Sequence, residues 1–355
     1  MLKVYTPINN DIYKAHLLIE FLVDNVWCVA DNSTVKTKLN QDLKKIYEEY
    51  DWFKNSIDKI YKVCKGLTLN EKDAFKKAFH ENNCIEELCT RDKQAVPLNS
   101  LNQSLLDVVI PFFKELYTKF LGWKLVYDKF GTKTSYYKTL ILKNQFKECP
   151  CCGFGDIKSI YSEGHSPYDH YLPQKHYPFS AINFHNLVPM CHTCNSTYKG
   201  ETDILQGDKK IFYPFSNIHP NIEVYVTVSK KHLPMLITSI EDNGDFLESD
   251  AIAVNFNIDD DKIESWNSIF KIKGRYFAKI ADYRVAWLND VREKYKIDKD
   301  RIQNYSFLDA FDDIIKSDSN KHLGFLKSPY LKNLKSYDSL IKAMEEVSTH
   351  SIISL

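Results

Sequence analysis

Cysteines, a histidine and several amides in the middle of the chain stand at spacings suited to metal chemistry. Two Cys-x-x-Cys pairs, Cys149/Cys152 and Cys191/Cys194, enclose residues 153–190. Two thiolates three positions apart on a tight turn converge on one ion at about 2.3 Å from zinc, and four such ligands complete a tetrahedron. A completed tetrahedron leaves no position at which water could be activated. The two pairs therefore predict a structural Zn²⁺ site.

The cysteines leave two alternatives. A pair of redox dithiols would need the strand-to-helix context of a thioredoxin-like motif, which the surrounding sequence lacks. Cys151 could replace Cys149 or Cys152 as a ligand, although only the pair at 149 and 152 keeps the usual spacing. The chain has nine cysteines and no stretch typical of a secretion signal, which argues against a disulfide framework. The remaining four are expected to be small buried hydrophobic residues: Cys28, Cys64, Cys84 and Cys89.

The segment between the cysteine pairs carries further polar motifs. It contains Asp169-His170 and an Asn-Leu-Val-Pro sequence that begins at Asn186. Asn195 follows the last cysteine directly, and Lys199 lies about one helical turn further on. In this order, and in combination with the cysteines, these motifs resemble the HNH (ββα-metal) endonuclease family. The resemblance covers residues 149–200 of the 355.

The resemblance implies a β-hairpin followed by a helix around one divalent metal ion. Asp169-His170 would end the first strand, Asn186 would lie in the loop and second strand, and the helix would begin at the second cysteine pair. His170 is then the general base, since an imidazole with a pKa of about 6.5 accepts a proton at neutral pH. Asp169 and Asn195 offer oxygen ligands to the metal, and Asn186 orients the ring of His170 through a hydrogen bond. Lys199 helps to neutralise the phosphate.

The third position of the family's pattern is Asn195 here, where the family name denotes a histidine. An amide oxygen suits a hard cation, which favours Mg²⁺ (or Mn²⁺) as the catalytic ion over Zn²⁺ or Ni²⁺. The implied reaction is single-metal hydrolysis of DNA phosphodiester bonds, and RNA stays open as a substrate.

Two settings and one rival are consistent with these residues. Large extra domains beside an HNH module resemble components of bacterial anti-phage defence systems, in which a nuclease acts beside a partner protein such as an ATPase subunit. A restriction endonuclease with its own sequence preference is the second setting. The rival is a non-catalytic zinc ribbon that binds nucleic acid or protein, in which Asp169, His170 and Asn195 are structural.

The charge balance shows no general affinity for nucleic acid. Lysine and arginine together number 47, as do aspartate and glutamate, so any attraction for phosphate must be local. The segment 119–147 concentrates seven lysines against Asp128 alone, with Tyr136 and Tyr137 among them. Such a run is either a solvated face or a phosphate-binding one next to the nuclease motif. Its lysines are Lys119, Lys124, Lys129, Lys133, Lys138, Lys143 and Lys147.

The elements that must position these residues follow from the apolar periodicity. The first third of the chain is expected to be helical, and apolar positions three and four residues apart from Leu39 to Cys64 predict one long helix. Thr68 and Glu71 form the pattern of a capping box, and Pro111 is expected to kink a later helix.

After residue 205 the pattern becomes partly β. Three β-rich runs occur at 222–229, 235–240 and 251–258. Asp242-Asn243-Gly244-Asp245 is a strong turn signal, so the last two runs are expected to form a hairpin. Helices are expected from about residue 262 to 296, and over about 303–316 and 336–349.

The predicted fold class is α+β, in three parts. These are a helical domain over residues 1–122, an HNH module with a basic lead-in and zinc knuckle over 123–205, and a C-terminal β-hairpin and helical region over 206–355. Glu20 and Asp24 interrupt the longest apolar run near the N-terminus, so no membrane span is expected and a cytoplasmic protein is predicted.

Overall fold

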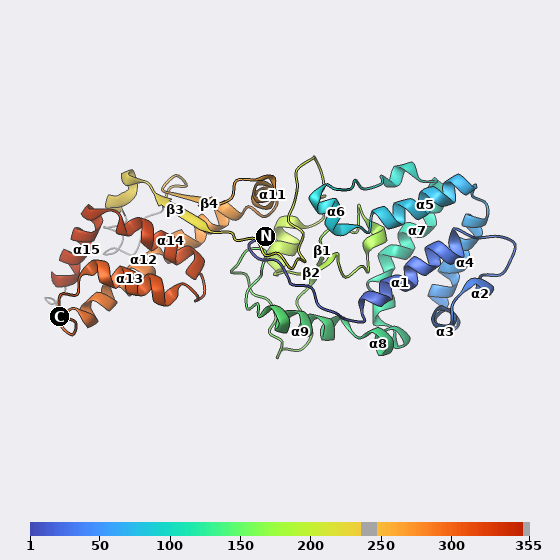
Figure 1. Ribbon diagram of the computed structural model, residues 1–355, viewed down its shortest axis with the longest axis horizontal. Helices are drawn as coiled ribbons and strands as arrows, with labels where there is room; N and C mark the ends of the chain where they lie inside the picture. The colour runs from blue at the N-terminus through green and yellow to red at the C-terminus, as the bar shows by residue number, and fades with distance from the viewer. Residues whose placement is uncertain (236–246, 351–355) are drawn as a thin grey trace. The chain divides into compact units, whose positions relative to one another are not determined.

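The computed structural model describes residues 1–235 and 247–350, which pack into two compact units (Figure 1). The first unit comprises Met1–Pro220 together with Asp261–Phe270, and the second comprises Asn221–Asp260 together with the chain from Lys271 onward. Both units contain helices and a short antiparallel sheet, which confirms the α+β class. The boundaries expected after residues 122 and 205 both fall inside the first unit.

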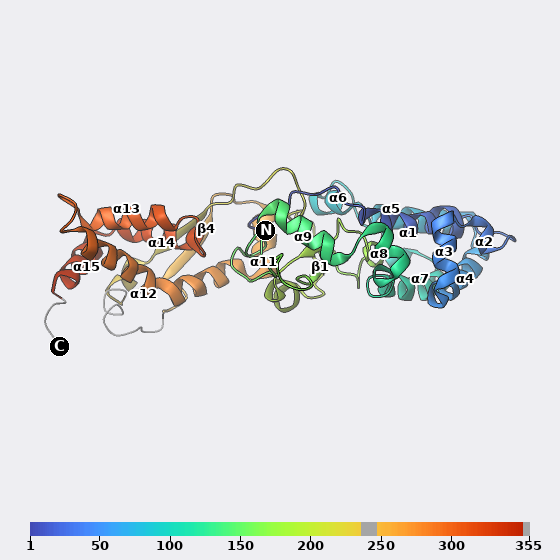
Figure 2. The same cartoon turned by 90° about the horizontal axis from the view of Figure 1, so that it is seen from below.

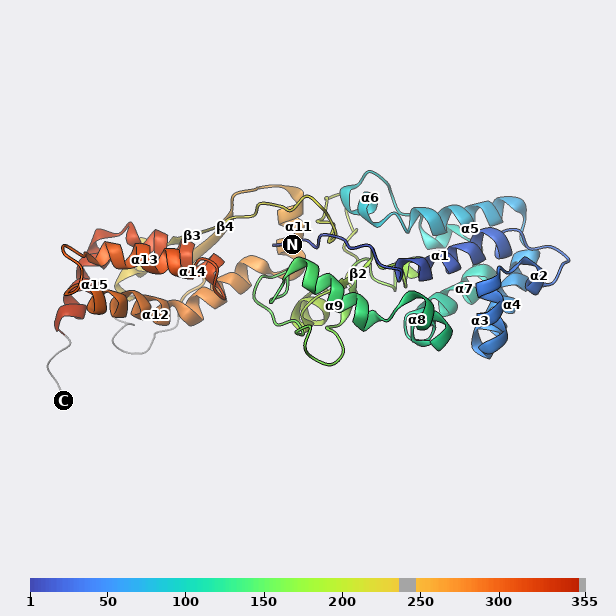
Figure 3. The ribbon, with the colours of Figure 1, turned by 60° about the horizontal axis from the view of Figure 1, so that its bottom comes forward.

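A helical bundle with an aromatic core forms much of the first unit. In it α4 (Asp51–Lys65) packs along α7 (Gln103–Leu116), as Figure 3 shows. The ring of Phe112 on α7 lies 5.4 Å from that of Trp27 and 5.9 Å from that of Phe53, between ring centroids. The other elements of the bundle are α1 (Tyr13–Leu22), the π-helical turn η1 (Val23–Trp27), α2 (Val35–Lys38), α3 (Gln41–Glu49), α5 (Leu69–Glu81), α6 (Ile85–Thr90) and the 3₁₀ turn η2 (Leu98–Ser100).

The apolar stripe from residue 39 to 64 forms two helices, so the prediction of one long helix was wrong. α3 ends and α4 begins around Tyr50, whose backbone is extended at φ −116° and ψ 101°. The ring of Tyr50 stacks on Trp123 with centroids 4.1 Å apart, a tertiary contact that local periodicity does not contain. The capping box of Thr68 and Glu71 opens α5 as predicted, and α7 continues through Pro111.

The lysine-rich segment is helical as well. It comprises the 3₁₀ turn η3 (Phe120–Gly122), α8 (Lys124–Phe130) and α9 (Lys133–Asn144), and Figure 2 shows the two helices. Tyr136 and Tyr137 are fully buried on α9, where both rings contact Tyr168. These two tyrosines therefore belong to the core and are not available to stack on nucleic-acid bases.

A small hairpin and a helical turn follow in the order strand, strand, helix. β1 (Tyr168–His170) pairs antiparallel with β2 (Leu187–Pro189), which places Asp169 opposite Val188. The connection between the strands contains the 3₁₀ turn η4 (Pro178–Ser180). The helical turn is η5 (Thr193–Lys199), a π-helix in which the Gly200 amide donates to the Asn195 carbonyl at 2.8 Å.

Distant segments brace this hairpin and the cysteine loops. The hydroxyl of Tyr5 donates to the Pro189 carbonyl at 3.0 Å. α11 (Asp261–Phe270) returns to the first unit from far along the chain, and its Trp266 Nε1 donates to the Cys151 carbonyl at 3.0 Å. The cysteine-rich segment is thus contacted both by residues that precede it in the chain and by residues that follow it.

The second unit is a β-ribbon packed on helices. β3 (Val224–Val228) pairs antiparallel with β4 (Ile252–Phe256), and β3 buries alternate valines against α14 (Gly324–Lys335). The 251–258 run therefore pairs with the 222–229 run, and residues 236–246, with most of the 235–240 run and the turn signal, lie outside the described residues. The expected long helix is interrupted at Lys271, which takes a left-handed φ of 52°. The described part of this unit also contains α12 (Ile272–Asp298), α13 (Phe307–Asp318), α15 (Asp338–His350) and the 3₁₀ turn η6 (Lys230–His232).

Within the described part of the chain, no helix is both long and apolar enough to cross a lipid bilayer.

Candidate metal centre and adjoining cavity

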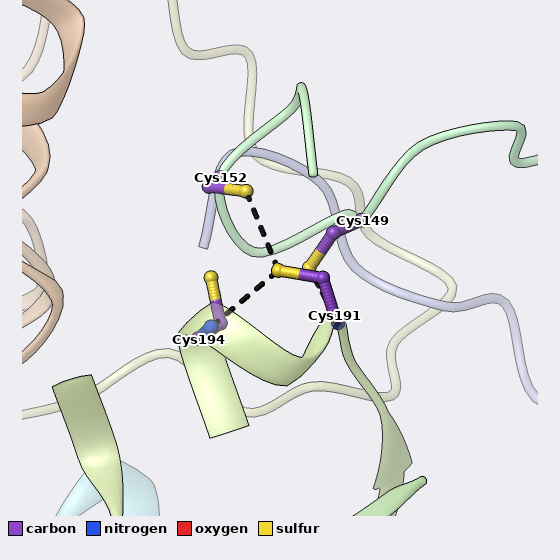
Figure 4. Close-up of side chains that lie close together, drawn as sticks. All are labelled: Cys149, Cys152, Cys191 and Cys194. Carbon is purple, nitrogen blue, oxygen red and sulfur yellow. Dashed lines mark hydrogen bonds between the residues drawn. The ribbon is translucent and has the colours of Figure 1, made fainter. Parts of the chain in front are cut away.

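The four cysteines of the two Cys-x-x-Cys pairs converge on one point (Figure 4). Their sulfurs all lie within 4.8 Å of one another, and the Sγ atoms of Cys152 and Cys191 are 4.0 Å apart. Four sulfurs at about 2.3 Å from a tetrahedral zinc ion are separated by about 3.8 Å, so the arrangement is close to that of a ligand set. All four residues are buried. The cluster can hold a structural metal such as zinc.

Gly155 shapes the loop that carries the first cysteine pair. A Cβ added at Gly155 would lie 2.5 Å from Cys191 Sγ and 3.2 Å from Cys152 Sγ, so no larger residue fits without moving the sulfurs. The Gly155 amide donates to Cys152 Sγ at 3.3 Å, and its carbonyl accepts from the Cys149 amide at 2.7 Å. Backbone amides directed at cysteine sulfurs stabilise thiolates, the form in which cysteine binds metal.

The thiols of the cluster influence one another. Burial raises the pKa of the Cys149 thiol, whereas the hydrogen bond from Cys149 lowers the pKa of Cys152. Cys151 is equally buried but is not among the four described residues whose sulfurs lie together. Its carbonyl accepts from the Leu2 amide at 3.3 Å as well as from α11. The ligand set is therefore the one that the sequence spacing favours.

Beside the cysteines lies an open cavity of about 530 Å³, which Asp169, His170 and Asn195 line together. Asp169 and His170 come from β1, and Asn195 comes from η5. The structure thus assembles three of the predicted site residues around one space.

Asp169 is a buried carboxylate with only one of its oxygens engaged. Its Oδ1 accepts from Lys199 Nζ at 3.0 Å, whereas Oδ2 is buried and has no hydrogen-bond partner among the described residues. Burial raises the pKa of Asp169, and the ammonium of Lys199 opposes that shift. A buried polar atom without a partner is costly in free energy, so Oδ2 has an unmet need for a hydrogen-bond donor or a cation.

His170 is held in one tautomer by the backbone. Its Nε2 lies 2.9 Å from the Ala181 carbonyl, and because a carbonyl oxygen can only accept, Nε2 carries the hydrogen and Nδ1 carries the lone pair. Burial lowers the pKa of His170 to about 4, and the charges of Lys199 and Lys133 act in the same direction. The ring of Tyr117 also packs on it, with centroids 4.9 Å apart. At neutral pH His170 is therefore uncharged, with a lone pair on Nδ1.

Asn186 does not bond to His170, which corrects the predicted orienting contact. The Asn186 side chain is fully buried, accepts from the Leu172 amide at 2.7 Å, and donates to the Leu172 carbonyl at 3.0 Å and to Ser180 Oγ at 2.9 Å. Ser180 directly precedes Ala181 in the chain. Asn186 therefore acts on His170 indirectly, by fixing the loop whose carbonyl holds the ring.

Lys199 is directed inward, which differs from the expected contact with a substrate phosphate. The side chain is 1% exposed, and Nζ donates to Asp169 and to the His170 carbonyl at 2.8 Å. These two bonds fix β1 to η5. A flexible lysine that reaches substrate would be solvent-exposed, so Lys199 is a positioning residue.

The lysine run provides fewer free charges than the sequence suggested. Lys119 pairs with Glu115 at 3.0 Å, and Lys129 pairs with Asp42 at 2.5 Å. Lys133 lies with its Nζ 4.2 Å from the centroid of the Tyr117 ring, close to His170.

Sequence reasoning missed the contributions of Ala181, Tyr117 and α7, because no local motif marks them.

Comparison with known proteins gives a distant relative. Protein ea31 of Escherichia phage lambda is 33% identical over 89 residues, which is 25% of this chain and 27% of the phage protein. The alignment thus spans about a quarter of either protein. No family model matches the chain, and no solved structure matches it.

Proposed function

We propose that this chain is a metal-dependent endonuclease of the HNH (ββα-metal) type that hydrolyses phosphodiester bonds of DNA. The supporting observation is that Asp169, whose buried Oδ2 has no partner among the described residues, lines the same cavity as a neutral His170 and Asn195. The two oxygen donors, the carboxylate of Asp169 and the amide of Asn195, suit Mg²⁺ or Mn²⁺ better than a softer ion.

When bound, Mg²⁺ would supply a Lewis acid beside the phosphate and the leaving oxygen. His170, with Nε2 held by Ala181, accepts a proton from water at Nδ1. The water oxygen forms a bond to phosphorus, the bond from phosphorus to O3′ breaks, and O3′ takes up a proton from solvent. The products are a 5′-phosphate and a 3′-hydroxyl. Lys199 opposes the rise in the pKa of Asp169 that burial causes and holds its carboxyl group in place.

The biological setting is part of the proposal. The formal net charge of zero leaves little general attraction for DNA, so affinity must come from local lysines or from a partner protein. Action in anti-phage defence beside an ATPase subunit is the proposed setting. In this setting the second unit would contact the partner protein, because the described residues that line the cavity all belong to the first unit.

A non-catalytic zinc ribbon that binds nucleic acid or protein is the second candidate. The observation in its favour is that Asn186 and Lys199 are engaged in internal hydrogen bonds that stabilise the hairpin. On that alternative the four-cysteine cluster and its hairpin form a rigid binding surface, and Asp169 contributes to stability alone.

Cleavage assays separate the two candidates. Purified protein is incubated with supercoiled DNA, linear DNA, single-stranded DNA and RNA in Mg²⁺, Mn²⁺ or EDTA. The nuclease proposal expects cleavage in Mg²⁺ or Mn²⁺ that is lost in Asn195→Ala and kept in His192→Ala, whose exposed histidine does not line the cavity. Intact nucleic acid under every metal condition would return the protein to the zinc-ribbon class.

A further inference from the structure

The charged side chains that line the cavity are paired, with one exception among the described residues. Asp169 is neutralised by Lys199 at 3.0 Å, and Glu201 is paired with Lys175 at 3.3 Å. Lys114 lines the same cavity, is exposed to solvent, and forms no ion pair with any residue that the structure describes. The cavity therefore presents one uncompensated positive charge, which attracts an anion.

The backbone that carries Lys114 is fixed relative to His170. Gln174 Nε2, from the connection between β1 and β2, donates to the carbonyls of Phe113 and Lys114 at 3.2 and 3.1 Å. Tyr117, on the turn that follows α7, packs its ring on His170. Two independent contacts thus join this end of α7 to the hairpin. Lys114 extends its flexible stem from an anchored position.

We propose that Lys114 makes the cavity an anion-binding subsite that takes a phosphate of the substrate strand. The inference rests on the proposed nuclease function for the identity of the anion as a nucleic-acid phosphate. Lysine contacts phosphate as a point charge and reads no base, so the subsite gives affinity without sequence preference. Lys114 takes the phosphate-neutralising role that the sequence assigned to Lys199, which is buried. Lys114 belongs to α7, outside the ββα motif.

The test compares Lys114→Ala with Lys77→Ala, since Lys77 is also exposed and without an ion pair among the described residues but does not line the cavity and lies outside the 119–147 lysine run. The first probe is a fluorescein-labelled oligothymidylate in buffer free of Mg²⁺ and Mn²⁺, where cleavage is not expected, with anisotropy measured over a range of KCl. We expect Lys114→Ala to weaken binding roughly tenfold and to flatten the slope of log Kd against log salt by about 0.7, as expected for one lost contact to a single strand. Lys77→Ala should match the wild type.

The second probe is inorganic phosphate, which tests the subsite independently of nuclease function. Phosphate should raise the melting temperature of the wild type and of Lys77→Ala, and should leave that of Lys114→Ala unchanged. Equal responses of the two variants to both probes, or no response of the wild type to either, would overturn the subsite. A phosphate effect that depends on Lys114, in a protein that neither binds the oligonucleotide nor cleaves DNA, would support the subsite and refute the nuclease.

Discussion

Replacing His170 by alanine removes the proposed proton acceptor without disturbing the metal ligands. Among the described residues the imidazole makes one hydrogen bond, to Ala181, and Asp169 should keep its bond to Lys199 in the variant. General bases contribute about 10²–10⁴-fold to a rate, so we expect His170→Ala to lower kcat by a factor in that range. The Kd for DNA and the zinc content should stay near those of the wild type.

The environment of His170 also fixes how the wild-type rate depends on pH. A histidine with the ordinary pKa of about 6.5 loses about 90% of its neutral form between pH 7.5 and pH 5.5, whereas one with a pKa of about 4 keeps about 97% of it. Because the folded-state pKa is lowered, the neutral base persists down to about pH 4. The cleavage rate should therefore be nearly constant from pH 7.5 to 5.5 and should halve near pH 4.

The assay is the initial rate of plasmid nicking at saturating DNA over this pH range. Raising Mg²⁺ or adding Mn²⁺ should recover part of the defect of Asn195→Ala, which lacks an oxygen ligand. The same additions should not rescue His170→Ala, because a cation cannot replace a proton acceptor. An acid limb near pH 6.5 would refute the argument from burial, and equal rates for wild type and His170→Ala would refute the catalytic role itself.

Three further predictions concern the metal centre and its support. Elemental analysis should find about one zinc per chain, and Cys191→Ser should lose the zinc together with most of the folding free energy of the first unit; unchanged zinc would contradict the site. Gly155→Ala should release zinc to a chelator faster than the wild type, because the added Cβ would lie 2.5 Å from Cys191 Sγ. The control is Gly122→Ala, which should release zinc at the wild-type rate because its added Cβ meets no atom within 4 Å. Lys199→Met should lower the free energy of unfolding by about 3–5 kcal/mol, because it leaves Asp169 buried and unpaired, and a urea midpoint equal to that of the wild type would count against this ion pair.

The candidate site was predictable as far as it is local in sequence. Asp169, His170 and Asn195 line one cavity because β1, β2 and η5 follow one another along the chain, the order of elements that the resemblance implied. The partner of His170 was not predictable, since the Ala181 backbone carbonyl carries no side-chain signature. The inward direction of Lys199 depends on burial that no motif encodes.

Sequence periodicity did not predict two features that depend on long-range contacts, for a similar reason. The break at Tyr50 depends on stacking against Trp123, a residue far along the chain. The β4 strand pairs with β3, where Val228 accepts a hydrogen bond from Tyr337 at 2.7 Å and its amide donates to Asn333 at 2.8 Å. The pairing of β4 with β3 is thus supported by residues far along the chain, which local sequence patterns do not encode.

The placement of α11 has a consequence for how the protein can be divided. Because Asp261–Phe270 belongs to the first unit while the residues on both sides of it belong to the second, the polypeptide passes between the units three times. A gene shortened after Pro220 would therefore encode a first unit without Trp266, which hydrogen-bonds the loop of the first cysteine pair. Such a fragment should be expressed poorly and hold zinc weakly. Functional dissection of this protein thus requires excising 221–260 and the segment from 271 onward while retaining α11 through a designed linker, rather than trimming from one end.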